Sequence, residues 1–260
     1  MRGNLSNFDI QTYRKFLIYL KTKYRIIPFC RFSKRYSSFL VLRHDVHSSL
    51  DAAFQMARLE RELRISSTYL VYVSNRFYSL PNSDDLALLR RICEMGHEIG
   101  LHYDLEEYRS YNRPIKETLL TEIHTLESLT RSKVSVIAMH NRSLYESDPF
   151  AEIDGIVNAY SFNRDHNAFY VSDSCRAWRI EDTHKLISEN PRRVQLLIHP
   201  FHWIPKVRNR YSSLDALFKG IDHRNRQLRS NWQDMWRRIP YVIKYDRDVE
   251  RLRSLLEFGT

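Results

Sequence analysis

Glycine, proline and cysteine are all scarce in this 260-residue chain, which contains 6, 8 and 3 of them. The low glycine and proline contents exclude collagen-like, linker-rich and low-complexity proteins. No run approaches about 18 consecutive apolar residues, so no transmembrane helix is predicted. The cysteines are widely spaced, which argues against a disulfide framework and against CxxC metal sites. Because the N-terminus also lacks the basic-then-apolar layout of a signal peptide, we expect a reduced, cytoplasmic protein.

Positive charge is in excess: 41 Lys and Arg oppose 31 Asp and Glu, for a formal net charge of +10. Between residues 206 and 238, nine basic residues oppose three acidic ones. Such an excess suits nucleic acid, an anionic membrane, a phosphorylated sugar or simply a solvated surface. Aromatic residues make up 13% of the chain, and their faces suit bases as well as sugar rings. Charge alone therefore does not select a partner.

Short apolar runs alternate with helical patterns, as in proteins built of βα units around a parallel sheet. We expect strands at 39–42, 67–73, 98–102, 134–139, 169–171 and 194–198. We expect helices at 8–24, after Ser48 and Ser49, from Ser83 to Gly96, and from Pro114 onward. No repeat or linker interrupts this pattern, so one α/β domain with helical flanks accounts for the chain.

Ionisable residues gather at the ends of the predicted strands. Six of the 11 histidines follow a strand: His44, His47, His102, His140, His199 and His202. Ligands of parallel α/β sheets and barrels bind at the carboxyl ends of the strands. Histidine and carboxylate side chains that converge there suit a divalent transition metal such as Zn²⁺, Mn²⁺, Fe²⁺ or Co²⁺. The pattern therefore predicts a metal or acid–base site at this rim.

Five blocks of sequence carry a further signal: VLRHDVHSSLDAAFQMARLERELRISSTY, GHEIGLHYD, AMHNRS, YVSDSCRAW and QLLIHPFHW. In this order they resemble the NodB-like polysaccharide deacetylases, in particular the WbmS-like branch whose first motif reads RHDVD. The resemblance implies a distorted (β/α) barrel of about seven parallel strands, to which the sequence pattern adds helical N- and C-terminal flanks. It also implies one divalent metal and hydrolysis of an N-acetyl amide on a sugar. We expect a single domain over 1–260, with a motif-bearing core at about 38–204 and a basic helical extension at about 206–260.

The resemblance also suggests roles for single residues. It implies that His102 binds the metal and that His199 is the general acid toward the leaving amine. The second metal histidine of the family lies four residues after the first, where this chain has Glu106. We expect His140, at the next strand end, to complete the shell.

The first block leaves two assignments open. Either Asp45 is a metal ligand, or it is the catalytic base and His47 is the ligand. Residues 45 and 47 point the same way on an extended strand, so both can reach the rim. His47 stands where the motif has Asp, which removes one negative charge from the site.

Three residues after the fifth predicted strand are candidates for substrate binding: Asp173, Arg176 and Trp178. They could hold sugar hydroxyls, a substrate carboxylate or a ring face, and local packing with Trp178 in the core is the alternative. Arg43 either binds an anion or pairs with an acid at the rim. His97 follows a turn, and we expect it to be structural.

These observations favour a metal-dependent N-deacetylase of an amino sugar, with Zn²⁺ as the first choice and Mn, Fe, Co or Ni as alternatives. The expected substrate is an N-acetylated nucleotide- or lipid-linked sugar, a cytoplasmic precursor in surface-polysaccharide synthesis. A second enzyme hypothesis keeps the metal but changes the substrate to another small-molecule C–N bond. A third is a basic binder of nucleic acid or other anions, which Trp232 and Trp236 among arginines would suit. A fourth is a degenerate, non-catalytic barrel, motivated by His47 and Glu106.

Overall fold

The structure is a computed structural model that describes residues 3–4, 8–73, 75, 77–110, 114–204 and 257–258. The expected basic helical extension at about 206–260, including the two tryptophans, lies outside the described residues except for 257–258. No helix in the described part of the chain is long and apolar enough to cross a membrane.

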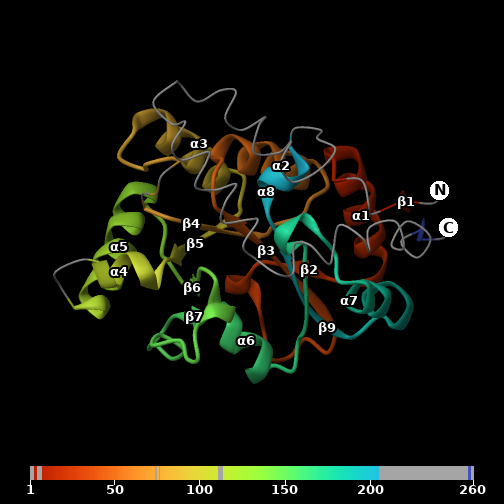
Figure 1. Ribbon diagram of the computed structural model, residues 1–260. Coiled ribbons are helices and arrows are strands. Elements are labelled where there is room, and N and C mark those ends of the chain that lie inside the picture. Colours follow the sequence, from red (N-terminus) through yellow and green to blue (C-terminus); the bar gives the residue numbers. More distant parts are fainter. Residues whose placement is uncertain are drawn as a thin grey trace.

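A sheet of parallel strands forms the centre of the molecule (Figure 1). Its order is β7 (Val157–Asn158), β6 (Val136–Met139), β5 (Glu98–Tyr103), β4 (Thr68–Val71), β3 (Phe39–Val46), β9 (Arg193–Ile198) and β8 (Phe169–Ser172). The short strand β2 (Ile26–Ile27) pairs with the first half of β3. Within the described residues the end strands β7 and β8 do not pair, so the barrel stays open there. The expected distorted barrel of seven parallel strands is confirmed.

Helices cover the sheet. They are α1 (Ile10–Lys23), α2 (Leu50–Glu62), α3 (Ser83–Glu94), α4 (Leu105–Ser110), α5 (Ile115–Thr130), α6 (Ala159–Asp165), α7 (Ile180–His184) and α8 (Pro200–Trp203). Short helical turns are η1 (Phe29–Arg31), η2 (Arg142–Leu144), η3 (Ser174–Arg176) and η4 (Lys185–Glu189), and β1 (Gly3–Asn4) pairs with β10 (Glu257–Phe258). The predicted cap of α2 is present, since the Ser49 hydroxyl accepts a hydrogen bond from the Ala52 amide.

The two faces of β3 carry different side chains because successive residues alternate across a strand. Phe39 and Val41 pack on the inner face, in a cluster with Phe162 of α6. Leu40 and Leu42 pack on the outer face against α1 and α2. Figure 1 shows α2 and α3 on one side of the sheet and α6 on the other.

The strand β3 is longer than its apolar run predicts. It continues from Leu42 to Val46 because its polar residues find partners on both faces of the sheet. Arg43 and Asp45 pair with each other on the inner face, and His44 pairs with Glu60 on the outer face. Asp45 and His47 thereby reach the inner rim of the barrel.

Gly100 of β5 allows the inner face to close tightly. A Cβ atom at this position would lie 2.5 Å from Leu70 Cδ2 and 2.6 Å from both Val136 Cγ1 and Val136 O. The close approach leaves room only for glycine, two residues before His102 on the same face of the strand.

Candidate metal and acid–base site

Four imidazoles converge at the carboxyl ends of the strands. The ring centre of His47, after β3, lies 5.1 Å from that of His102 at the end of β5. It lies 4.8 Å from that of His140, after β6, and 4.9 Å from that of His199, after β9. Residues far apart in the sequence thus meet at one rim, as expected for a site built on parallel strands.

Hydrogen bonds fix the orientation of two of these rings. His102 Nδ1 donates to the carbonyl oxygen of Ala138 at 2.8 Å, which leaves Nε2 to face the cluster. His140 Nδ1 lies 2.9 Å from Asp104 Oδ2. The two contacts are of the kind that orient metal-binding histidines, because they fix the tautomer and leave the opposite nitrogen free to ligate.

Burial keeps the central imidazoles neutral. Desolvation lowers the pKa of His102 to about 3, although the nearby Asp45 carboxylate opposes this effect. Desolvation, together with the neighbouring histidines, holds the pKa of His47 well below its usual range. His47 Nε2 and His102 Nε2 lie 3.0 Å apart. Because a metal binds the neutral form of imidazole, both rings are in the protonation state that a metal site needs at neutral pH.

Asp45 is held as an anion by Arg43. The guanidinium binds both carboxylate oxygens at 2.7 Å, and Arg43 is fully buried. Arg43 also donates to Gln195 Oε1 at 3.3 Å and lies over the ring of Tyr160. Burial alone would raise the pKa of Asp45, but the charge of Arg43 outweighs it and the pKa is about 2. Of the two roles considered for Arg43, the structure shows the pairing with a rim acid.

His199 rests on a buried carboxylate. Asp173 accepts hydrogen bonds from the amide and Nδ1 of His199, the latter at 2.6 Å, and from Trp203 Nε1 at 2.8 Å. His202 Nδ1 lies 3.4 Å from the same carboxylate. Although burial opposes ionisation, His199 and His202 hold the pKa of Asp173 well below its usual range. The pair leaves Nε2 of His199 to face the rim and resembles the acid–base pairs of hydrolases.

The residues considered for sugar binding pack inside the molecule in this structure. Asp173 is 0% exposed and directs both oxygens to His199, His202 and Trp203, so it does not face the rim. Trp178 is 1% exposed and lies among Phe8, Phe16 and Trp203. Arg176 is buried, with its guanidinium 5.4 Å from the ring centre of Phe8. This placement matches the packing alternative, and sugar binding by these residues stays a prediction without a contact to support it.

Two further residues lie outside the convergent group. His44, which we expected at the rim, faces the opposite side of the sheet, where its Nε2 is 2.8 Å from Glu60 Oε1. Because successive side chains of a strand point to opposite faces, His44 points away from the face that Asp45 and His47 share. Glu106, at the position of the family's second metal histidine, is exposed in the first turn of α4.

Sequence reasoning did not assign the roles of Asp104 and Trp203. Asp104 directly follows β5 and contacts His140, and Trp203 contacts Asp173 from α8. A signal for Asp104 is present in the sequence, because it is a carboxylate two residues after His102 at a strand end. The contact of Trp203 depends on how α8 folds back, which local sequence does not reveal.

No protein-family model matches the sequence, and no curated protein matches it. Among solved structures, the chain is similar to BA3943, a CE4 family pseudoenzyme from Bacillus anthracis (14% identity, TM-score 0.41, 74% of this chain and 63% of that chain). It is also similar to the chitin deacetylase from the fungal pathogen Colletotrichum lindemuthianum (14%, 0.41, 69% and 81%). A third is a family 4 acetyl xylan esterase from Clostridium thermocellum in complex with a cobalt ion (15%, 0.39, 71% and 84%).

The alignment covers less than two thirds of the length of BA3943. At these identities and TM-scores, the comparisons carry no conclusion about the reaction of this chain.

Proposed function

We propose that this protein is a metal-dependent hydrolase that removes the N-acetyl group from an amino sugar. The observation that carries the proposal is the convergence of neutral imidazoles, an ionised Asp45 and the His199–Asp173 pair at one rim. Such a set combines ligands for a metal, a carboxylate that can accept a proton and an imidazole that can donate one. The resemblance of the sequence blocks to NodB-like deacetylases supports an acetamide as the bond that is cleaved.

The spacing of three rings fits a metal ion. The ring centres of His47, His102 and His140 are separated by 4.8, 5.1 and 5.6 Å. Imidazoles that bind one tetrahedral zinc ion at about 2.0–2.1 Å have ring centres about 5 Å apart. Asp45 is close enough to join them, since its carboxylate and the ring nitrogens of His47 and His102 lie within 4.8 Å of one another. We assign the three histidines as ligands, with Zn²⁺ preferred because imidazole suits it.

Asp45 then serves as the base. Arg43 already donates to both of its oxygens, which fixes its orientation and leaves lone pairs that can accept a proton from the attacking water. A bound divalent metal would supply the Lewis acid that polarises the amide and acidifies the water, which a base as weak as Asp45 requires.

His199 acts at the other end of the reaction. Its Nδ1 is held by Asp173, which leaves Nε2 as the nitrogen that can carry a proton to the substrate. A protonated His199 donates its Nε2 proton to the departing amine, which would otherwise leave as an unstable anion. Asp173 is a positioning residue in this scheme, because it touches His199 and not the rim.

The substrate we propose is an amino sugar attached to a phosphorylated carrier, such as a nucleotide- or lipid-linked precursor made in the cytoplasm. The net charge of +10 supports this class because a cationic protein attracts phosphorylated substrates.

Metal content and acetate release together test the proposal. The purified protein should hold about one transition metal per chain, and His102→Ala and His140→Ala should each lose it. The matched control is His124→Ala, since His124 is an exposed histidine on α5 and should keep the metal. His199→Ala should keep the metal but lose acetate release at least about hundredfold.

The outcomes separate the hypotheses. A wild-type protein that holds no metal after reconstitution would overturn the hydrolase mechanism and favour a non-catalytic barrel. Full metal occupancy without His140 would replace that residue in the shell by Asp45. A metal-loaded protein that releases no acetate from N-acetylated sugars would move the proposal to another C–N bond.

A further inference from the structure

A second pocket lies at the opposite end of the sheet from the histidines. Its volume is about 770 Å³, and it is bounded by residues that precede β3, β8 and β9, among them Ser37, Asn167 and Arg192. Arg193 opens the six-residue strand β9, and His199 follows the end of that strand. At about 3.3 Å per residue, the pocket and the rim are about 20 Å apart. The pocket is therefore separate from the proposed catalytic site.

The lining of this pocket is basic. Lys185, Arg192 and Arg193 contribute three exposed cations, and none of the described residues that line it is acidic. Within the part of the chain that the structure describes, none of these three cations forms an ion pair. Lys185 also interacts with the charge of the nearby Asp182, so Arg192 and Arg193 supply most of the free positive charge. Positive charges around one concave surface attract an anion, since a cleft concentrates the field of the charges that line it.

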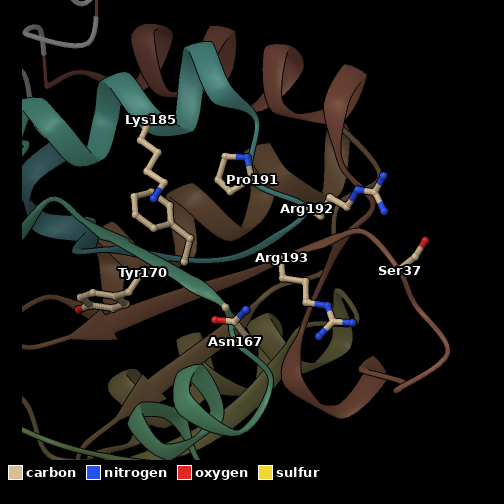
Figure 2. A pocket seen from close by; sticks show the side chains of 9 residues that line it. Ser37, Asn167, Tyr170, Lys185, Pro191, Arg192 and Arg193 are labelled. Carbon is tan, nitrogen blue, oxygen red and sulfur yellow. The ribbon is translucent and has the colours of Figure 1, made fainter.

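Neighbouring groups hold two of these cations in place. Arg193 Nη1 donates to the carbonyl oxygen of His166 at 3.1 Å, and Lys185 Nζ lies 4.9 Å from the ring centre of Phe169. Figure 2 shows Lys185 and Pro191 on one side of the pocket and Asn167 and Arg193 on the other. Arg193 has five N–H donors and uses one of them in this bond, so the remaining donors can reach a ligand.

From these features we propose that the pocket binds a small molecule whose phosphate groups carry at least two negative charges. Arginine forks match phosphate oxygens in pairs, and lysine adds a point charge. A volume of about 770 Å³ lies within the range of small-molecule pockets. Pro191 and Phe169 supply an apolar wall beside the cations, against which the organic part of such a molecule would pack.

Calorimetric titration with pyrophosphate and with adenosine diphosphate tests the proposal. Both should bind the wild-type protein at low salt, and binding should weaken as salt screens the cations. Lys185→Ala and Arg192→Ala should each weaken binding about tenfold, and Arg192→Ala/Arg193→Ala about hundredfold. The matched control is Lys116→Ala, because Lys116 is an exposed lysine on α5, away from the pocket, and should bind as the wild type does.

Two comparisons keep the result independent of the proposed function. His102→Ala should bind both anions normally, because the pocket does not use the rim. Among the described residues, the side chains of Lys185 and Arg192 form no hydrogen bond to the backbone, so circular dichroism should show both variants folded. No binding of either anion by the wild type, or binding that the pocket substitutions leave unchanged, would overturn the proposal whether or not the protein hydrolyses an amide.

Discussion

One strand, β3, supplies histidine and carboxylate chemistry to both faces of the sheet, with opposite results. On the inner face, Asp45 and His47 meet His102 at the rim. On the outer face, His44 meets Glu60 of α2, which is 0% exposed. The two clusters have similar residue types and lie within a few residues of each other, so composition alone does not distinguish them.

The clusters differ in how their hydrogen bonds are satisfied. Glu60 accepts hydrogen bonds from the hydroxyls of Tyr13 and Ser67, both at 2.5 Å, and from Tyr69 at 3.1 Å. Burial opposes its ionisation, but His44 outweighs that effect and lowers the pKa of Glu60 to about 2. In the inner cluster two Nε2 atoms face each other at 3.0 Å, where at most one hydrogen can lie between them. Hydroxyl donors hold the carboxylate of Glu60, although Nδ1 of His44 has no hydrogen-bond partner among the described residues. A buried carboxylate held by several donors stabilises a fold, whereas ring nitrogens that converge on one point favour a bound cation.

Among the predicted effects, the loss of stability on removal of Glu60 should be the largest. It should also distinguish the two clusters, because metal binding by the inner cluster should not change. Glu60→Ala leaves His44 and the hydroxyls of Tyr13, Tyr69 and Ser67 buried without their acceptor. We expect the free energy of unfolding to fall by about 3–5 kcal/mol, as for other broken buried ion pairs. Urea denaturation measures this change. Any variant protein that folds should bind metal at the wild-type stoichiometry, because the inner cluster does not use Glu60.

The control for this substitution lies two residues further along the same helix. Glu62 pairs with Arg14 at the surface, where its side chain is 56% exposed. Glu62→Ala should change the stability by less than about 1 kcal/mol. If Glu60→Ala and Glu62→Ala lower the free energy of unfolding equally, the outer cluster does not stabilise the fold more than a surface ion pair does. If folded Glu60→Ala loses the metal, metal binding depends on the outer cluster as well as on the inner one.

Much of the fold could be predicted from the sequence because apolar runs mark buried strands. The run before His102 predicts a strand at 98–102, and β5 spans Glu98–Tyr103. The apolar run does not predict that β3 continues to Val46, because the burial of Arg43 depends on its contacts with Asp45, Gln195 and Tyr160. The sheet order also lies beyond local sequence, since it places β9 beside β3 across about 150 residues of chain.

Part of the candidate site could also be predicted from the sequence. The spacing of Asp45 and His47 on one strand predicts a shared face, and the structure brings both to the rim. The same alternation excludes His44 from that rim once the strand is known to extend through residue 46. The contacts of Asp104 and Trp203 were not predictable, because they depend on how segments after different strands pack together.

Asp104→Asn should produce an intermediate effect, confined to the inner cluster. Asp104 holds Nδ1 of His140, and the pKa of Asp104 is lowered by this hydrogen bond against the opposing effect of burial. Loss of the carboxylate should weaken metal binding about 10–100-fold, as for other residues that orient metal-binding histidines. Competition with a chelator of known affinity measures this change.

The neighbouring Glu106 supplies the control for Asp104. Glu106→Gln alters an exposed carboxylate at the position where the resembled family has a metal histidine. Metal affinity should be unchanged in Glu106→Gln, and the stability of both metal-free variants should stay within about 1 kcal/mol of the wild type. A loss of affinity in Glu106→Gln would instead make Glu106 a ligand and remove His140 from our assignment.

The smallest predicted effect is a difference in pH dependence between the clusters of the metal-free protein. The pKa of His102 is about 3 in the folded state, because of burial, and its ordinary value is 6.5. Between pH 3 and pH 6.5 the imidazole of His102 is protonated in the unfolded chain and neutral in the folded protein. The contribution of His102 to stability is therefore fully present above pH 6.5 and is lost as the pH falls toward 3. Glu60 has a folded pKa of about 2 against an ordinary value of 4.5, so its contribution is lost only below pH 4.5.

The window from pH 6.5 to 5 therefore reports on histidines and not on Glu60. In this window we expect His102→Gln to flatten the fall in stability by up to about 1.4 kcal/mol per pH unit, the contribution of one imidazole. Glu60→Gln should lose slope below pH 4.5, where the carboxylate of Glu60 takes up a proton in the unfolded chain. Urea denaturation at a series of pH values measures both slopes. If His102→Gln keeps the wild-type slope, His102 is not held neutral by burial, and the inner cluster loses the property that distinguishes it as a metal site.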